Sequence, residues 1–121
     1  MQAKKTLVMG ASTEPGRYAY KAVKMLQRFG HPVVAVGKKE DQLDGIKIEK
    51  GPAPFTGVNT VTLYLNPMNQ KQYYDYIVSL KPQRVIFNPG TENPELYAIL
   101  NEHDINVEVG CTLVMLTINQ Y

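Results

Sequence analysis

The residue types and spacings best suited to chemistry follow the first hydrophobic segment. Lys5-Thr6-Leu7-Val8-Met9 runs directly into Gly10-Ala11-Ser12-Thr13-Glu14-Pro15-Gly16-Arg17. Small residues between a strand and a helix leave backbone N–H groups exposed at the helix N-terminus, which favours phosphate binding. A hydroxyl and a guanidinium would add to those donors. The candidate contacts are Gly10, Ala11, Ser12, Arg17 and Tyr18.

This turn satisfies the dinucleotide fingerprint G-x-G-x-x-G only in part. Gly10 fills the first position, whereas Ser12 and Pro15 stand at the second and third. The position of the turn directly after a strand is therefore the main argument for phosphate binding. The alternative is a plain strand-to-helix turn without a ligand.

A second chemical feature is the pair of lysines after the next apolar segment. Val33-Val34-Ala35-Val36 leads into Gly37, Lys38 and Lys39. NAD sites usually have an acidic residue at this position, because a carboxylate accepts hydrogen bonds from the ribose hydroxyls. Lysines instead attract a phosphate on the ribose, so coenzyme A and NADP both fit and NAD fits poorly. The alternative is two solvated charges in a surface loop.

Further candidates stand where later apolar segments end. Leu65-Asn66 and Asn88-Pro89-Gly90 contain Asn-Pro turn signals, and their amides are secondary candidates for ligand contact. Cys111 follows the last predicted strand; packing is the simpler role for a free cysteine, and a reactive thiol is the alternative. His31 and His103 precede strands, so we expect surface loops away from the cleft. No catalytic constellation and no metal-ligand spacing is evident.

The elements that must position these residues alternate along the chain. Strands are expected over 6–9, 33–36, 60–65, 84–87 and 105–109, with helices over about 17–29, around 73–80 and from Pro94. A short extended piece is expected at 46–48, and 112–118 has helix or strand character. This alternation predicts an α/β fold: an open parallel five-stranded sheet, order 3-2-1-4-5, with helices on both faces. Ligands of such sheets bind at the carboxyl ends of the strands.

Composition narrows the classes of protein. A chain of 121 residues forms one domain, and a net charge of +2 does not indicate nucleic-acid binding. The single cysteine excludes an internal disulfide, and the first apolar run is too short for a signal peptide or membrane span. We expect a cytoplasmic protein.

Taken in order along essentially the whole chain, these features resemble those of the small single-domain CoA-binding proteins. That family is related to the N-terminal nucleotide domain of the succinyl-CoA synthetase α subunit. The resemblance rests on Gly10-Ala11-Ser12 with Pro15 and Arg17-Tyr18, the 33–37 strand, Asn88-Pro89-Gly90 and the ending from Gly110 to Leu116. It implies a Rossmann-like domain that holds coenzyme A by its phosphates at the first turn. The phosphohistidine of the synthetases has no counterpart here, so ligase activity is not implied.

The sequence thus leads to three hypotheses. The first is a module that binds coenzyme A or an acyl-CoA without catalysis of its own, as a regulatory protein or for an acyl-CoA-using partner. The second is an NADP-dependent oxidoreductase domain, and the third is an interaction protein that kept the fold and lost the ligand. A tyrosine-rich helix and an apolar C-terminal segment are compatible with a homodimer.

Overall fold

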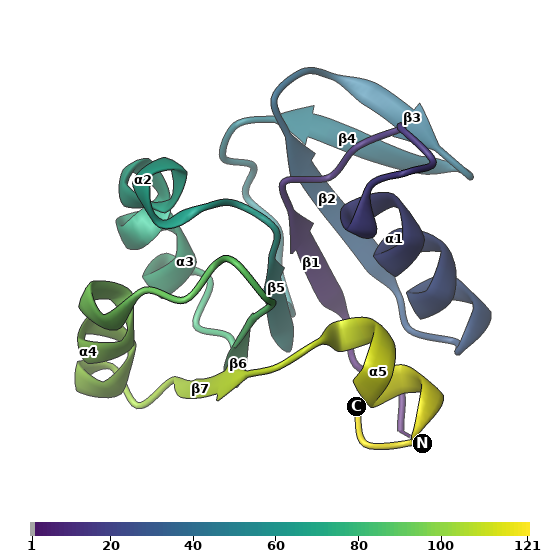
Figure 1. The fold of residues 1–121 in the computed structure, drawn as a ribbon. Helices are drawn as coiled ribbons and strands as arrows, with labels where there is room; N and C mark the ends of the chain where they lie inside the picture. Colours follow the sequence, from purple (N-terminus) through teal and green to yellow (C-terminus); the bar gives the residue numbers. More distant parts are fainter. Residues whose placement is uncertain (1) are drawn as a thin grey trace.

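The computed structural model describes residues 2–121, which form a mostly parallel sheet with helices on both faces (Figure 1). The strands are β1 Thr6–Met9, β2 Val33–Gly37, β3 Asp41–Leu43, β4 Ile46–Lys50, β5 Thr60–Leu63, β6 Arg84–Phe87 and β7 Asn106–Val109. The helices are α1 Tyr18–Arg28, α2 Pro67–Gln70, the 3₁₀ helix η1 Lys71–Tyr73, α3 Tyr74–Ser79, α4 Pro94–Glu102 and α5 Thr112–Thr117. The predicted α/β class is confirmed, and the segment of undecided character near the end is a helix.

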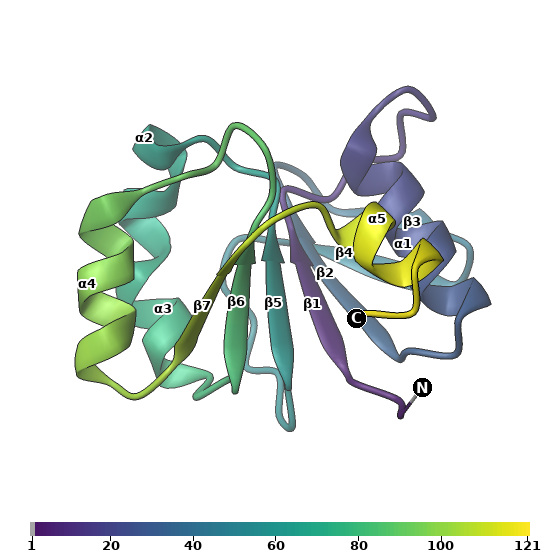
Figure 2. The same cartoon turned by 60° about the horizontal axis from the view of Figure 1, so that its bottom comes forward.

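Two apolar cores lie on the two faces of the sheet. All residues of β1, β5 and β6 are buried, as expected for parallel strands covered on both sides. Leu7 and Met9 of β1 belong to the core shared with α3 and α4, whereas Val8 belongs to the core shared with α1. Figure 2 places α2, α3 and α4 together on one face, with α1 and α5 on the other. The alternating side chains of the strands thus hold both helical layers.

The strand order differs from the expected one in an informative way. The sheet has the order β3-β4-β2-β1-β5-β6-β7, so it contains seven strands rather than five. The place beside β2, which we expected the 60–65 strand to take, is occupied by β4. β5 instead pairs with β1 on its other side. The chain therefore winds outward from β1, returns, and winds outward again, and the change of direction lies beside β1 as expected.

A hairpin at one edge of the sheet accounts for the additional strands. Leu43 of β3 pairs with Ile46 of β4 in antiparallel register across a two-residue turn. That turn is Asp44-Gly45, and both residues have positive φ, 49° and 79°. Asp-Gly favours this type of hairpin because its backbone twist matches the twist of the flanking strands. The signal was present in the sequence, where we expected only a short extended piece.

Tyr121 packs at the amino ends of the strands, where it contacts Thr6, Lys4 and Arg84. The Tyr121 hydroxyl shares a hydrogen bond of 2.6 Å with the Thr6 hydroxyl, and the Lys4 ammonium donates to the Tyr121 backbone oxygen at 2.6 Å. Arg84 stacks over the Tyr121 ring, 4.3 Å from its centre. No helix within residues 2–121 is long and apolar enough to cross a membrane.

His31 lies in this same cluster, and the expectation of a surface histidine is wrong for it. The residue is 2 % exposed, because its ring packs against Tyr121 at 4.8 Å between ring centres. Its Nδ1 accepts a hydrogen bond of 3.0 Å from the Lys4 backbone N–H, which requires that nitrogen to be unprotonated. Burial, together with the positive charges of Lys4 and Arg84, lowers the pKa of His31 below 6.5. His103, in contrast, is an exposed loop residue.

The lowered pKa of His31 predicts acid destabilisation. Below pH 6.5, the folded protein binds fewer protons at His31 than the unfolded chain does. The stabilisation that neutral His31 gives the folded state is therefore fully present above pH 6.5 and is lost as pH falls through the folded-state pKa. One group can contribute a slope of at most about 1.4 kcal/mol per pH unit. Urea unfolding of wild type and His31→Gln between pH 7.5 and 5 measures it. We expect the variant to lose less stability over this interval; parallel curves would contradict the assignment.

Candidate functional site

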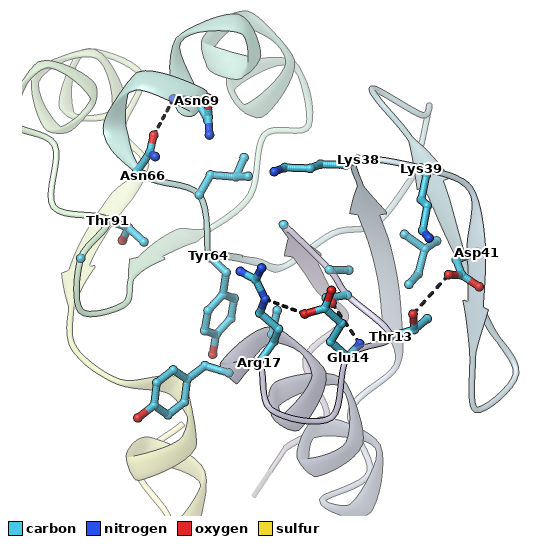
Figure 3. A pocket seen from close by; sticks show the side chains of 18 of the residues that line it. Thr13, Glu14, Arg17, Lys38, Lys39, Asp41, Tyr64, Asn66, Asn69 and Thr91 are labelled. Atoms are coloured by element: carbon cyan, nitrogen blue, oxygen red, sulfur yellow. Dashed lines mark hydrogen bonds and ion pairs between the residues drawn. The ribbon is translucent and has the colours of Figure 1, made fainter.

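A cleft of about 710 Å³ opens at the carboxyl ends of the strands, beside the point where the chain changes direction (Figure 3). Its volume falls within the range of small-molecule sites. The cleft is lined by Gly10, Ala11, Ser12, Thr13, Glu14, Arg17, Tyr18, Ala19, Lys38, Lys39, Asp41, Ile48, Tyr64, Leu65, Asn66, Asn69, Pro89, Gly90 and Thr91. Most residues predicted from the strand ends are therefore brought together in one cleft.

The turn between β1 and α1 is fixed by the end of β2. The N–H groups of Gly10 and Ala11 both donate to the Val36 carbonyl, at 2.9 and 3.0 Å. Gly10 has φ +89°, a conformation that side chains with a Cβ rarely adopt. These two N–H groups are therefore already used by the protein. The next two, of Ser12 and Thr13, form no hydrogen bond within residues 2–121 and remain as donors.

The N-terminus of α1 is the second source of donors. Arg17 occupies the N-cap position with extended backbone, φ −83° and ψ 141°, and its side chain does not cap the helix. The first-turn N–H groups thus lack the side-chain acceptor that commonly satisfies them. Arg17 forms an ion pair with Glu14 at 3.1 Å, and both side chains are about two-thirds exposed. Such a pair contributes little stability, so Arg17 can exchange it for an incoming anion.

Gly37 lies beneath this turn and does not line the cleft. A Cβ on Gly37 would stand 2.7 Å from the Ala11 carbonyl oxygen and 2.8 Å from Ile48 Cγ2. Both distances are shorter than van der Waals contact, so a side chain here would displace the turn. The glycine therefore permits close packing of β2 against the turn, and the structure does not place this predicted contact residue in the cleft lining.

Lys38 and Lys39 extend from the end of β2 into the cleft wall (Figure 3). Both are exposed, and neither forms an ion pair with any acid in the described part of the chain. Sequence reasoning missed the acid that shares this end. Asp41, in β3, accepts a hydrogen bond of 3.2 Å from the Thr13 hydroxyl. The Asp-Gly hairpin signal would have placed it here.

The far wall is formed by the ends of β5 and β6, where Leu65, Asn66, Pro89 and Gly90 line the cleft as predicted. The Asn66 side chain accepts from the Asn69 N–H at 2.9 Å and so caps α2. The buried Gln70 donates to the backbone oxygens of Leu65 and Thr91, each at 2.8 Å. This wall is thus held in place by buried side-chain bonds.

Asn88 and Cys111 do not line the cleft. Asn88 is 2 % exposed and donates to the Thr62 hydroxyl at 2.7 Å and the Leu63 carbonyl at 2.9 Å. Its side-chain oxygen Oδ1 accepts a hydrogen bond from the Thr112 N–H at 2.8 Å, which ties α5 to the sheet. Cys111 is half-buried at the N-cap of α5. Asn88 therefore acts as a structural connection. The structure does not place its amide, a secondary candidate for ligand contact, in the cleft lining.

Tyr64 is another lining residue that sequence reasoning missed. It follows β5, and its ring packs against the core shared with α1. Burial raises the pKa of its hydroxyl to about 12, so Tyr64 is neutral at physiological pH. Within residues 2–121, no group of three or more His, Cys, Asp and Glu side chains could hold a metal ion.

The two asparagines that follow β5 and β6 give a test of this distinction. Asn88→Ala removes three buried hydrogen bonds, each with a net contribution of about 1 kcal/mol, so we expect destabilisation of about 3 kcal/mol. Asn66→Ala removes one exposed helix cap and should cost about 1 kcal/mol. Denaturant unfolding of both variants measures the difference. Equal losses would show that Asn88 is not the connection described.

Comparison with known proteins identifies solved structures with this fold. A crystal structure of an uncharacterized protein is 50 % identical, with both chains fully covered and a TM-score of 0.97. A hypothetical protein from Pyrococcus horikoshii OT3 is 22 % identical over 98 % of this chain and 84 % of its own, with a TM-score of 0.86. Part of the dinucleotide forming acetyl-coenzyme A synthetase 1 from Ca. Korarchaeum cryptofilum, in complex with phosphate and ADP, superposes with a TM-score of 0.69. That match is 16 % identical and covers 87 % of this chain and 25 % of the synthetase chain.

No curated protein matches the chain significantly. The sequence profile of the CoA binding domain, however, matches residues 4–117, which is nearly the whole chain and includes every wall of the cleft. The chain therefore belongs to the CoA binding domain family.

Proposed function

We propose that this protein binds coenzyme A, free or acylated, in the cleft at the carboxyl ends of its strands, and acts as a binding module without catalysis of its own. The observation that carries the proposal is the β1–α1 turn. Ser12 and Thr13, whose N–H groups form no hydrogen bond within residues 2–121, line the same cleft as Arg17 at the uncapped start of α1. Such a cluster of donors suits the diphosphate of a nucleotide.

The charges around the cleft support a ligand with more than one phosphate. Three cationic residues, Arg17, Lys38 and Lys39, line it against two acidic ones, Glu14 and Asp41. Arg17 adjoins the turn, whereas the two lysines follow the strand that leads to the ribose in dinucleotide folds. The diphosphate and the ribose phosphate of coenzyme A would thus each meet cations, through charge-assisted hydrogen bonds.

A protein of this kind serves by holding its ligand. It would present coenzyme A or an acyl-CoA to a separate enzyme, or change its behaviour when the ligand is bound. NADP also carries a ribose phosphate and shares the first part of this argument, so it is the ligand against which the proposal is tested.

Calorimetric titration of the full chain with CoA, NADPH and NADH tests the proposal. We expect CoA to bind more tightly than NADPH and NADH to bind weakest, because NADH lacks a phosphate for the lysines. Tighter binding of NADPH would favour the oxidoreductase hypothesis. Binding of none of the three would contradict the proposal and favour a protein that kept the fold without the ligand.

A double variant tests the role of the lysines. Lys38→Ala/Lys39→Ala should weaken the binding free energy of CoA by about 1.5–3 kcal/mol, because charge-assisted contacts to the ribose phosphate are lost. Dephospho-CoA, which lacks that phosphate, should be affected far less. The matched control is Arg28→Ala/Lys81→Asn, which removes two exposed positive charges outside the cleft lining; asparagine tolerates the φ of +50° at position 81. Equal weakening of both ligands would remove the assigned role.

A further inference from the structure

An acid stands in a cleft whose other features favour anions. Asp41 of β3 lines the cleft at the end where Lys38 and Lys39 project (Figure 3). A carboxylate at this position repels a phosphorylated ligand, and the repulsion is stronger in a partly enclosed cleft than in open water. The ligand that fits this end must therefore offer the carboxylate a donor as well as offering the lysines a phosphate.

The hydrogen bonds of Asp41 leave room for such a donor. Its Oδ2 accepts from the Thr13 hydroxyl at 3.2 Å, and its Oδ1 accepts from the Gln42 N–H at 2.9 Å. An ionised carboxylate can accept about four hydrogen bonds, so each oxygen keeps a free lone pair. Asp41 forms no ion pair with a cationic side chain of residues 2–121, and the side chain is half-buried. These two bonds therefore leave both oxygens of Asp41 able to accept from a ligand.

The chemistry of the ribose supplies that group. In common dinucleotide sites, an acid at the end of the second strand accepts hydrogen bonds from the ribose hydroxyls. Here that strand ends at Gly37 and is followed by Lys38 and Lys39, and the acid comes from the β3–β4 hairpin instead. A ribose with one phosphorylated and one free hydroxyl offers an anion to the lysines and a donor to the acid.

Resting on the proposed function, we infer that Asp41 is a specificity-determining residue that accepts a hydrogen bond from the free ribose hydroxyl of the nucleotide. In coenzyme A the 3′ position carries the phosphate, so the free hydroxyl is the 2′ one. Asp41 and the lysine pair thus recognise adjacent positions of one sugar ring.

The test pairs a change in the protein with a change in the ligand. Affinities of wild type and Asp41→Asn for CoA and 2′-deoxy-CoA are measured by calorimetry at one ionic strength. Wild type should lose about tenfold in affinity when the 2′-hydroxyl is removed, because a hydrogen bond to a charged group is lost. Asp41→Asn should bind CoA about tenfold more weakly than wild type and discriminate between the two ligands by less than about twofold.

The control separates this role from support of the turn. Thr13→Val keeps the shape of residue 13 and removes its bond to Asp41, so it should change the affinities for both ligands equally. The inference is overturned if Asp41→Asn tightens CoA binding, which simple repulsion predicts, or weakens both ligands alike. The wild-type comparison needs no variant: equal binding of CoA and 2′-deoxy-CoA overturns the inference and leaves the proposed function standing. Failure of wild type to bind CoA at all overturns the proposed function itself.

Discussion

The architecture of the cleft depends on one acceptor, the Val36 carbonyl, which receives the N–H groups of both Gly10 and Ala11. This pair of bonds joins the end of β1 to the end of β2 and sets the direction in which the chain leaves the sheet. The absence of a side chain at Gly37 lets the turn settle against β2. Because these two N–H groups are used within the fold, the next donors of the turn are the N–H groups of Ser12 and Thr13, which form no hydrogen bond within residues 2–121. The site is thus a consequence of how two central strands are joined.

The electrostatic design places its cations where they are weakly held. Arg17 has only an exposed partner in Glu14, and the two lysines have no acidic partner within residues 2–121. The buried side-chain hydrogen bonds lie elsewhere: those of Gln70 hold the wall at Leu65 and Thr91, and the bond between Asn88 and the Thr112 N–H ties α5 to the sheet. A rigid frame with loosely held charges lets a ligand gain electrostatic attraction without breaking strong internal bonds.

Much of this arrangement could be predicted from the sequence, and the failures have physical reasons. The helical spacing of Ala19, Ala22, Val23 and Leu26 gave α1 almost to the residue, and the rule that ligands bind at strand ends brought most cleft residues together. The strand order was wrong because β4 is a short strand in which Lys47, Glu49 and Lys50 are charged, which leaves little apolar signal. Without β4, the predicted strand over 60–65 was the remaining candidate for the position beside β2. Asn88 and Asn66 both precede a proline, but Asn88 directly follows β6 and is buried, whereas Asn66 lies three residues beyond the end of β5 and is exposed.

The β3–β4 hairpin occupies the border of the sheet, and β3 has a single neighbour over three residue pairs. Its tip, Asp44-Gly45, is exposed and carries no part of the cleft lining. Peripheral segments of this kind accept insertion and exchange more readily than the central strands. The cleft therefore joins an inner turn that cannot change without disturbing the central strands to an outer hairpin whose tip can be lengthened or exchanged with less effect on the sheet.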